Sequence, residues 1–187
     1  MQELLDEKEF YGNCCNTYDE EYKHFIYAQF MGLPISCYFI NLHKSSRILD
    51  VGGGPVSMLL KTLNLKEGCV WDPTVYPKWT EYRYKAKNIK VVHDYGENLK
   101  EKGWDEVWLY NSLQYVEDPE KLINNCLNAA KIFRIFEWVD TPIHEGKPFT
   151  IRAEDLNRWI GNKGQVVTLD DPMCNGKAFF GSFSTGN

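Results

Sequence analysis

Residues 47–57 read RILDVGGGPVS, an apolar run that contains one acid and is followed by three consecutive glycines. Ile48, Leu49 and Val51 are typical of a buried parallel strand, whose sequence is almost continuously apolar. The glycines at 52–54 allow a tight turn and let a ligand approach bare backbone. Strand and turn together favour the first crossover of a nucleotide-type binding fold.

The residues after the glycines predict a helix. Pro55 is suited to a first helical turn, where its missing N–H is no loss. Val56, Leu59, Leu60 and Leu63 follow at helical spacing, so we expect them to face the sheet.

Asp50 indicates the charge of the ligand that this turn would bind. In a dinucleotide site the strand end and the next helix N-terminus hold a pyrophosphate, which a nearby carboxylate would repel. A carboxylate suits a cationic ligand better. The segment resembles motif I of the class I S-adenosylmethionine-dependent methyltransferases, whose ligand carries a sulfonium and an α-ammonium. Asp50, Gly52 and Gly54 match the family pattern of an acid followed by glycines at alternate positions, whereas Val56 stands where a third glycine is usual. The resemblance implies S-adenosylmethionine as the cofactor.

Composition limits the partners and the compartment. The chain has 187 residues, of which 43% are hydrophobic, enough for one domain with a substantial core. Its formal net charge is −5 and its lysines and arginines are scattered, which disfavours a nucleic-acid partner. The polar, acidic N-terminus and the absence of a long apolar run predict no membrane association and a cytoplasmic location. The spacing of the six cysteines resembles neither a zinc ribbon nor a redox pair, so we expect no metal site. The sequence leaves the oligomeric state open.

We expect a single domain over residues 1–187, in which an N-terminal helical cap (1–44) packs on a methyltransferase-like core (45–187). Within the cap, the pattern predicts a helix over 19–31, with Gly32 and Pro34 as stop signals. One face of that helix would carry Tyr22, Phe25, Ile26, Gln29 and Phe30.

The core alternates strands and helices as a doubly wound α/β fold requires. Further strands are predicted at 69–71, 89–92, 106–110 and 132–139, and helices at 118–131 and 153–160. The last two apolar runs, 165–169 and 178–182, are joined by a loop too short for a parallel crossover, so they should pair antiparallel. The resemblance implies a Rossmann-like, seven-stranded, mostly parallel sheet that ends in this C-terminal antiparallel hairpin.

Several residues are candidates for binding the cofactor. Asp72 follows the second expected strand, 20 residues after Gly52, where a carboxylate can accept hydrogen bonds from both ribose hydroxyls. The resemblance also implies that an acid after the third strand binds the adenine amino group, with a neighbour packed on the ring, and Asp94 and Tyr95 occupy that place. It further implies that the segment after the fourth strand lines the ligand. The full cofactor-binding set is Asp50, Gly52, Gly53, Gly54, Asp72, Asp94, Tyr95, Asn111, Ser112 and Leu113.

The resemblance implies in-line transfer of a methyl group, with the protein contributing chiefly alignment. It does not fix the acceptor, which we expect to be a small molecule methylated on oxygen or nitrogen. A hydroxyl acceptor also needs a base, and the candidates are His24, Tyr115 and His144. Two alternatives remain. A NAD-dependent oxidoreductase shares the crossover and the ribose-binding acid. A catalytically silent S-adenosylmethionine-binding module is kept open by Val56 and by the lack of a clear base.

Overall fold

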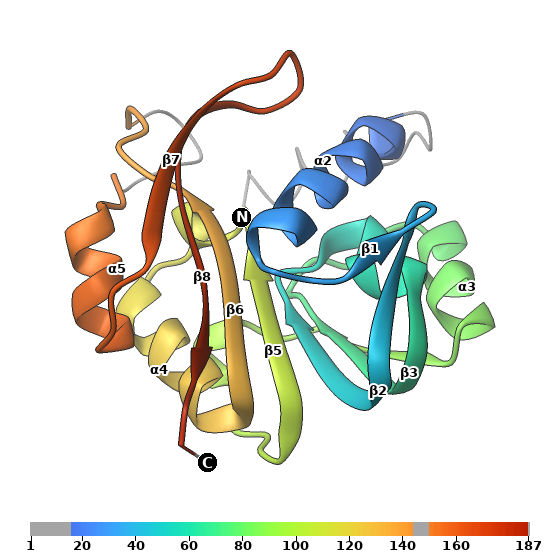
Figure 1. The fold of residues 1–187 in the computed structure, drawn as a ribbon. Helices are drawn as coiled ribbons and strands as arrows, with labels where there is room; N and C mark the ends of the chain where they lie inside the picture. Colours follow the sequence, from blue (N-terminus) through green and yellow to red (C-terminus); the bar gives the residue numbers. More distant parts are fainter. Residues whose placement is uncertain (1–15, 144–149, 187) are drawn as a thin grey trace.

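The computed structural model describes residues 16–143 and 150–186, and over these ranges eight strands form one mixed sheet (Figure 1). The path across the sheet is β4-β3-β2-β5-β6-β8-β7, and β1 pairs with β2 beside it. The strands are β1 (Ile35–Ser36), β2 (Phe39–Val51), β3 (Thr62–Trp71), β4 (Ile89–Val92), β5 (Trp104–Tyr110), β6 (Ala130–Trp138), β7 (Gln165–Asp170) and β8 (Asn175–Ser184).

The strands of the α/β core occur where the sequence predicts them. β2 to β6 are parallel, and β8 returns antiparallel between β6 and β7, which confirms the closing hairpin. The sheet differs from the expected seven strands because β1 adds a short antiparallel pair to β2. Cys37 and Tyr38, with φ of 48° and 65°, make the tight turn that lets the chain fold back at this point.

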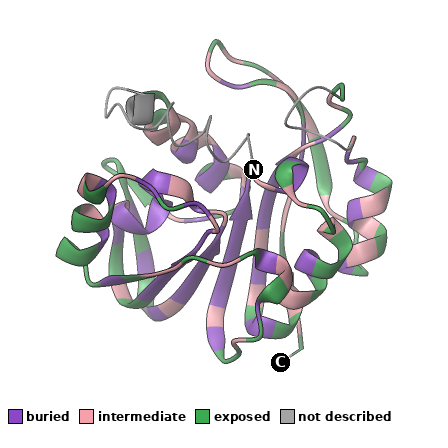
Figure 2. Ribbon diagram, turned by 180° about the vertical axis from the view of Figure 1, so that it is seen from behind, coloured by how far each residue is buried: buried purple, intermediate pink, exposed green. Residues whose placement is uncertain are grey.

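Alternate residues along the strands pack on opposite faces of the sheet. On one face, Leu49 and Val107 belong to a core that includes α4 (Pro119–Ala129) and α5 (Ala153–Ile160). On the other, Ile48 and Trp108 pack with α2 (Asn16–Phe30) and α3 (Lys78–Ala86). Figure 2 shows the resulting concentration of buried residues on the central strands. No helix in the described part of the chain is both long enough and apolar enough to cross a bilayer.

Two expectations about the cap need correction. Its helix, α2, ends at Phe30, and residues 35–36 and 39–44 are strand rather than helix. The buried face of α2 is also rotated from the predicted one, because Tyr27, Ala28 and Met31 are buried whereas Tyr22 is 49% exposed. Helical spacing of the large apolar residues placed Tyr22 inward, whereas the buried stripe follows Tyr27, Ala28 and Met31.

The predicted helix after the glycines is also wrong. Two short 3₁₀ turns, η1 (Gly54–Val56) and η2 (Met58–Lys61), occupy its place, and β3 begins at the next residue. Ser57 breaks the helix with an extended backbone (ψ 144°), and its hydroxyl donates to the Asp50 carboxylate and accepts the Leu59 N–H. Val56, Leu59 and Leu60 are buried as expected, whereas Leu63 lies on the strand and is 41% exposed.

Candidate active site

Each residue of the glycine turn favours glycine, through its backbone angles, through lack of room for a side chain, or both. Gly52 and Gly54 have φ of 71° and 61°, a region that favours glycine. A Cβ at Gly52 would lie 2.6 Å from the Cβ of Ser112, and a Cβ at Gly53 would lie 2.7 Å from the carboxyl carbon of Asp50. The sequence prediction of a close backbone turn is therefore confirmed.

Two buried tyrosine hydroxyls hold this turn. The Tyr84 hydroxyl on α3 donates to the Gly54 carbonyl at 2.5 Å and accepts the Ser57 N–H at 2.9 Å. The Tyr110 hydroxyl, at the end of β5, donates to Asp50 Oδ2 at 2.6 Å and accepts the Met58 N–H at 3.1 Å. Sequence analysis missed both residues, because a tyrosine in a helix or strand gives no local sign of a long-range backbone contact.

Asp50 lies beneath the turn rather than on the surface of the cavity. It is fully buried, and burial raises its pKa to about 7 although hydrogen bonds from Ser57 and Tyr110 act in the opposite direction. Its Oδ1 has no hydrogen-bond partner within the described part of the chain. Its position suits support of the glycine turn from below.

Asp72 lies at the end of β3 and faces the cavity. Its Oδ2 accepts the Gly54 N–H at 3.0 Å and its Oδ1 accepts the Thr74 N–H at 2.9 Å. Burial raises its pKa, and these backbone donors lower it. The Thr74 side chain also hydrogen-bonds this carboxylate. A carboxylate has about four acceptor sites, so Asp72 keeps capacity for a ligand hydroxyl.

A cavity of about 480 Å³ opens beside this turn. It lies at the carboxyl ends of the parallel strands, where β2 has β3 on one side and β5 on the other. Doubly wound folds bind ligands at this switch in strand order. Its described lining includes Glu20, His24, Tyr27, Gly52, Gly53, Gly54, Trp71, Asp72, Tyr76, Tyr95, Glu97, Tyr110, Asn111, Ser112, Tyr115 and Glu117.

Of the pair predicted after the third strand, only Tyr95 lines the cavity. Asp94 Oδ1 instead accepts the Tyr95 N–H and the Asn98 side-chain amide, both at 2.8 Å, and so stabilises the turn η3 (Gly96–Asn98). The Trp71 indole donates to the Tyr95 carbonyl at 3.1 Å, which fixes this side of the cavity.

The segment after β5 contributes two of its three predicted residues. Asn111, with φ of 51°, and Ser112 line the cavity, whereas Leu113 is buried in the core. Glu137, which the sequence analysis missed, accepts the Ser112 and Leu113 N–H groups at 2.8 and 3.2 Å. A single acid inside an apolar strand was the signal that could have identified it.

Among the three candidate bases, the structure brings His24 and Tyr115 to the cavity, and His144 lies outside the described residues. His24 is buried, and its pKa is lowered to about 3, chiefly by burial and then by the positive charge of Lys61. Tyr115 is 42% exposed at the opening. In residues 16–143 and 150–186, no three His, Cys, Asp or Glu side chains are placed to hold a metal ion.

No protein-family model matches this sequence, and no curated protein matches it either. Several solved structures, by contrast, are similar to this chain in fold. One chain of the complex between the Haloferax volcanii Trm112 methyltransferase activator and a methyltransferase partner has a TM-score of 0.67 and 13% identity, with 96% of each chain covered. An S-adenosylmethionine-dependent methyltransferase from Thermotoga maritima has a TM-score of 0.59 and 14% identity, with 96% of this chain and 99% of that chain covered.

The magnesium protoporphyrin IX methyltransferase of Synechocystis, solved with bound S-adenosylhomocysteine, has a TM-score of 0.56 and 11% identity, with 73% and 74% of the two chains covered. The parallel core strands and the terminal antiparallel hairpin are also those that the sequence resemblance implies. The chain therefore has the fold of the class I S-adenosylmethionine-dependent methyltransferases.

Proposed function

We propose that this protein is an S-adenosylmethionine-dependent methyltransferase that transfers a methyl group in line to the oxygen or nitrogen of a small molecule. The observation that carries this proposal is the cavity at the glycine turn, which combines bare backbone with the buried Asp72 carboxylate. The solved structures named as methyltransferases support it through their shared fold.

The lining fits the chemical groups of this cofactor. Asp72 would accept hydrogen bonds from the ribose hydroxyls, because it lines the cavity directly after β3 and its carboxylate retains acceptor capacity. Trp71 and Tyr95 offer apolar surface for the adenine, while the turn at 52–54 and Ser112 would contact the methionine portion. The bound cofactor supplies a methyl group activated by a sulfonium, and the protein aligns the acceptor with it.

The same geometry disfavours the oxidoreductase alternative. A dinucleotide site places its pyrophosphate at the N-terminus of the crossover helix, where the helix dipole attracts anions. Here the crossover consists of 3₁₀ turns of three and four residues, η1 and η2. The cavity is also lined by several carboxylates, which would repel a pyrophosphate.

Titration calorimetry with S-adenosylmethionine and with NAD, under the same conditions, tests the proposal. We expect S-adenosylmethionine to bind and NAD to show no heat of binding. The Asp72→Ala variant should bind S-adenosylmethionine more weakly by about 1–3 kcal/mol, the scale of hydrogen bonds to a charged group. Asp170→Ala, which removes an exposed carboxylate on β7, is the matched control and should bind normally. Tight binding of NAD alone would contradict the proposal.

Formation of S-adenosylhomocysteine separates an active enzyme from a silent binding module. The protein, S-adenosylmethionine and a mixture of small acceptors are incubated together, and the thioether is followed by mass spectrometry. Its accumulation above an acceptor-free control supports catalysis, whereas binding with no turnover across the mixture favours the silent module.

A further inference from the structure

The end of the cavity nearest α2 has a chemical character distinct from that of the cofactor side. It is formed by Glu20, His24 and Tyr27 from α2 and by Tyr110 from β5. The His24 ring lies edge-on to Tyr110 with 5.4 Å between centroids, and the Tyr27 and Tyr110 centroids are 6.0 Å apart. Three aromatic rings and one carboxylate thus share a small space, here called the cap end.

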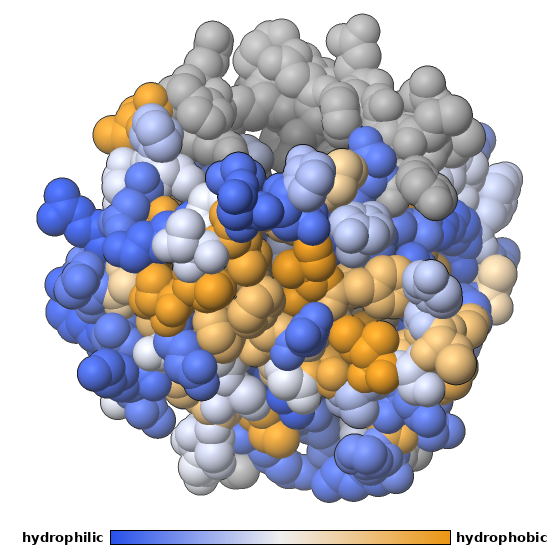
Figure 3. Space-filling model, turned by 45° about the horizontal axis from the view of Figure 1, so that its top comes forward, coloured by the Kyte–Doolittle hydropathy of each residue, from blue (hydrophilic) through white to orange (hydrophobic). Residues whose placement is uncertain are grey.

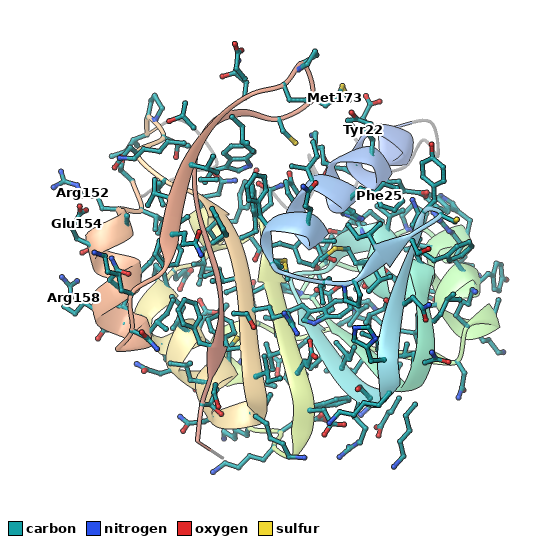
Figure 4. All side chains as sticks on the ribbon, in the orientation of Figure 1. Tyr22, Phe25, Arg152, Glu154, Arg158 and Met173 are labelled. Atoms are coloured by element: carbon teal, nitrogen blue, oxygen red, sulfur yellow. The ribbon has the colours of Figure 1, made fainter. Side chains whose placement is uncertain are left out.

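The charges around the whole cavity are of one sign. Its carboxylates are Glu20, Asp72, Glu97 and Glu117, and the lining drawn from residues 16–143 and 150–186 includes no lysine or arginine. Cationic side chains lie away from the cavity. In Figure 4, Arg152 and Arg158 point outward at α5, which packs on the opposite face of the sheet from α2.

We propose that the methyl acceptor is a small organic amine seated at the cap end, where Glu20 and the rings of Tyr27 and Tyr110 hold its positive charge. This inference rests on the proposed function. Aromatic faces attract cations through their quadrupole, most strongly where water is excluded, and a carboxylate adds a direct ionic contact. Glu20 already receives the Lys23 ammonium on Oε1 at 2.6 Å. Lys23 does not line the cavity, and a carboxylate has acceptor sites enough for a second ammonium.

A nitrogen acceptor is also consistent with the charges at the cap end before and after methyl transfer. The amine loses its ammonium proton to water and attacks as the free base; its lone pair forms the new C–N bond as the S–C bond breaks, and that bonding pair stays on sulfur. The products are a neutral thioether and an N-methylammonium, so one positive charge is present before and after transfer. Four carboxylates along the lining favour that charge in both states.

A hydroxyl acceptor would need a base at the cap end to take its proton. Burial lowers the pKa of His24 to about 3, which makes its imidazole a weak base. Burial raises the pKa values of Tyr27 and Tyr110, so neither phenol ionises near neutral pH. An amine must also lose a proton, but its ammonium gives that proton to water before the attack, so no side chain has to act as a base during the transfer.

Binding of two probes of matched shape tests the inference. Phenethylamine is an ammonium ion at pH 7.5, and 2-phenylethanol is its neutral counterpart. Both are titrated into the protein saturated with S-adenosylhomocysteine, and saturation itself is verified first by calorimetry. We expect the amine to bind at least ten times more tightly than the alcohol. Failure of the amine to bind more tightly than the alcohol overturns the inference.

Variants on α2 locate the effect. Glu20→Gln should bring the affinity for phenethylamine to within about threefold of that for 2-phenylethanol, while S-adenosylhomocysteine binds as before. Asp19→Asn, the same change at the exposed neighbouring position, should leave the preference intact. An unchanged preference in Glu20→Gln would overturn the role of the cap end. If S-adenosylhomocysteine and S-adenosylmethionine both fail to bind, the proposed function fails first, and the two failures are thereby distinguished.

Discussion

A variant with asparagine in place of Asp50 should become more stable, relative to the unaltered chain, as the pH rises. Asp50 is fully buried, and its Oδ2 accepts hydrogen bonds from Ser57 and Tyr110. An asparagine oxygen can accept the same two bonds. The substitution therefore removes the charge while keeping most of the packing, and the free energy of unfolding should depend less on pH in the variant.

The magnitude follows from the pKa of this carboxyl group. Burial raises it from 3.8 to about 7 in the folded protein, while the unfolded chain keeps the ordinary value. Between these two values the folded state holds one proton more than the unfolded state, so stability falls as pH rises, by about 1.4 kcal/mol per pH unit. When the pH rises from 5 to 8, the free energy of unfolding of the unaltered chain should fall by about 2–3 kcal/mol more than that of Asp50→Asn.

Urea unfolding at pH 5 and pH 8 measures this difference directly. Stability is compared between the two proteins at each pH, so that contributions from the other titrating groups cancel. Asp19→Asn, an exposed position on α2, controls for the loss of one negative charge. If the stability difference between Asp50→Asn and the unaltered chain were the same at both pH values, the assignment of a raised pKa to Asp50 would be refuted.

Three other substitutions test the site. Gly53→Ala should destabilise the fold by about 2 kcal/mol or more in thermal unfolding, since its Cβ would lie 2.7 Å from the Asp50 carboxyl carbon. Tyr84→Phe should cost about 1–3 kcal/mol in urea unfolding, because the Gly54 carbonyl loses its donor. His24 has a pKa of about 3 in the folded protein and 6.5 in the unfolded chain, so between pH 7 and pH 5 only the unfolded chain gains its proton and folding is destabilised. When the pH falls from 7 to 5, His24→Phe should therefore lose about 2 kcal/mol less stability than the unaltered chain. Parallel pH profiles for His24→Phe and the unaltered chain would count against that burial effect.

Several strands and helices of the core could be predicted because their signals are local. Ile89–Val92 and Ala153–Ile160 occur at the predicted residues, and Asp118 caps α4 by accepting the Lys121 N–H at 3.0 Å. Apolar runs, capping acids and glycine stops each act over a few residues, so a single sequence reveals them.

The crossover after the glycines could not be predicted in the same way. Its apolar spacing is helical, but Ser57 and the two tyrosine hydroxyls impose 3₁₀ turns through contacts with residues up to 52 positions away. Asp94 shows the same limit at the site. Its position in the chain suited a ligand contact, yet its carboxylate is engaged by the neighbouring turn.

The two tyrosine hydroxyls at the glycine turn have a consequence for how the protein folds. Tyr84 comes from α3 and Tyr110 from β5, so the turn acquires its hydrogen bonds only after elements from three parts of the chain have docked. Its backbone amides should then exchange with solvent only through openings close in free energy to global unfolding, unlike those of most surface loops. The binding loop would thus belong to the most cooperative unit of the protein, and the site and the core would be lost together.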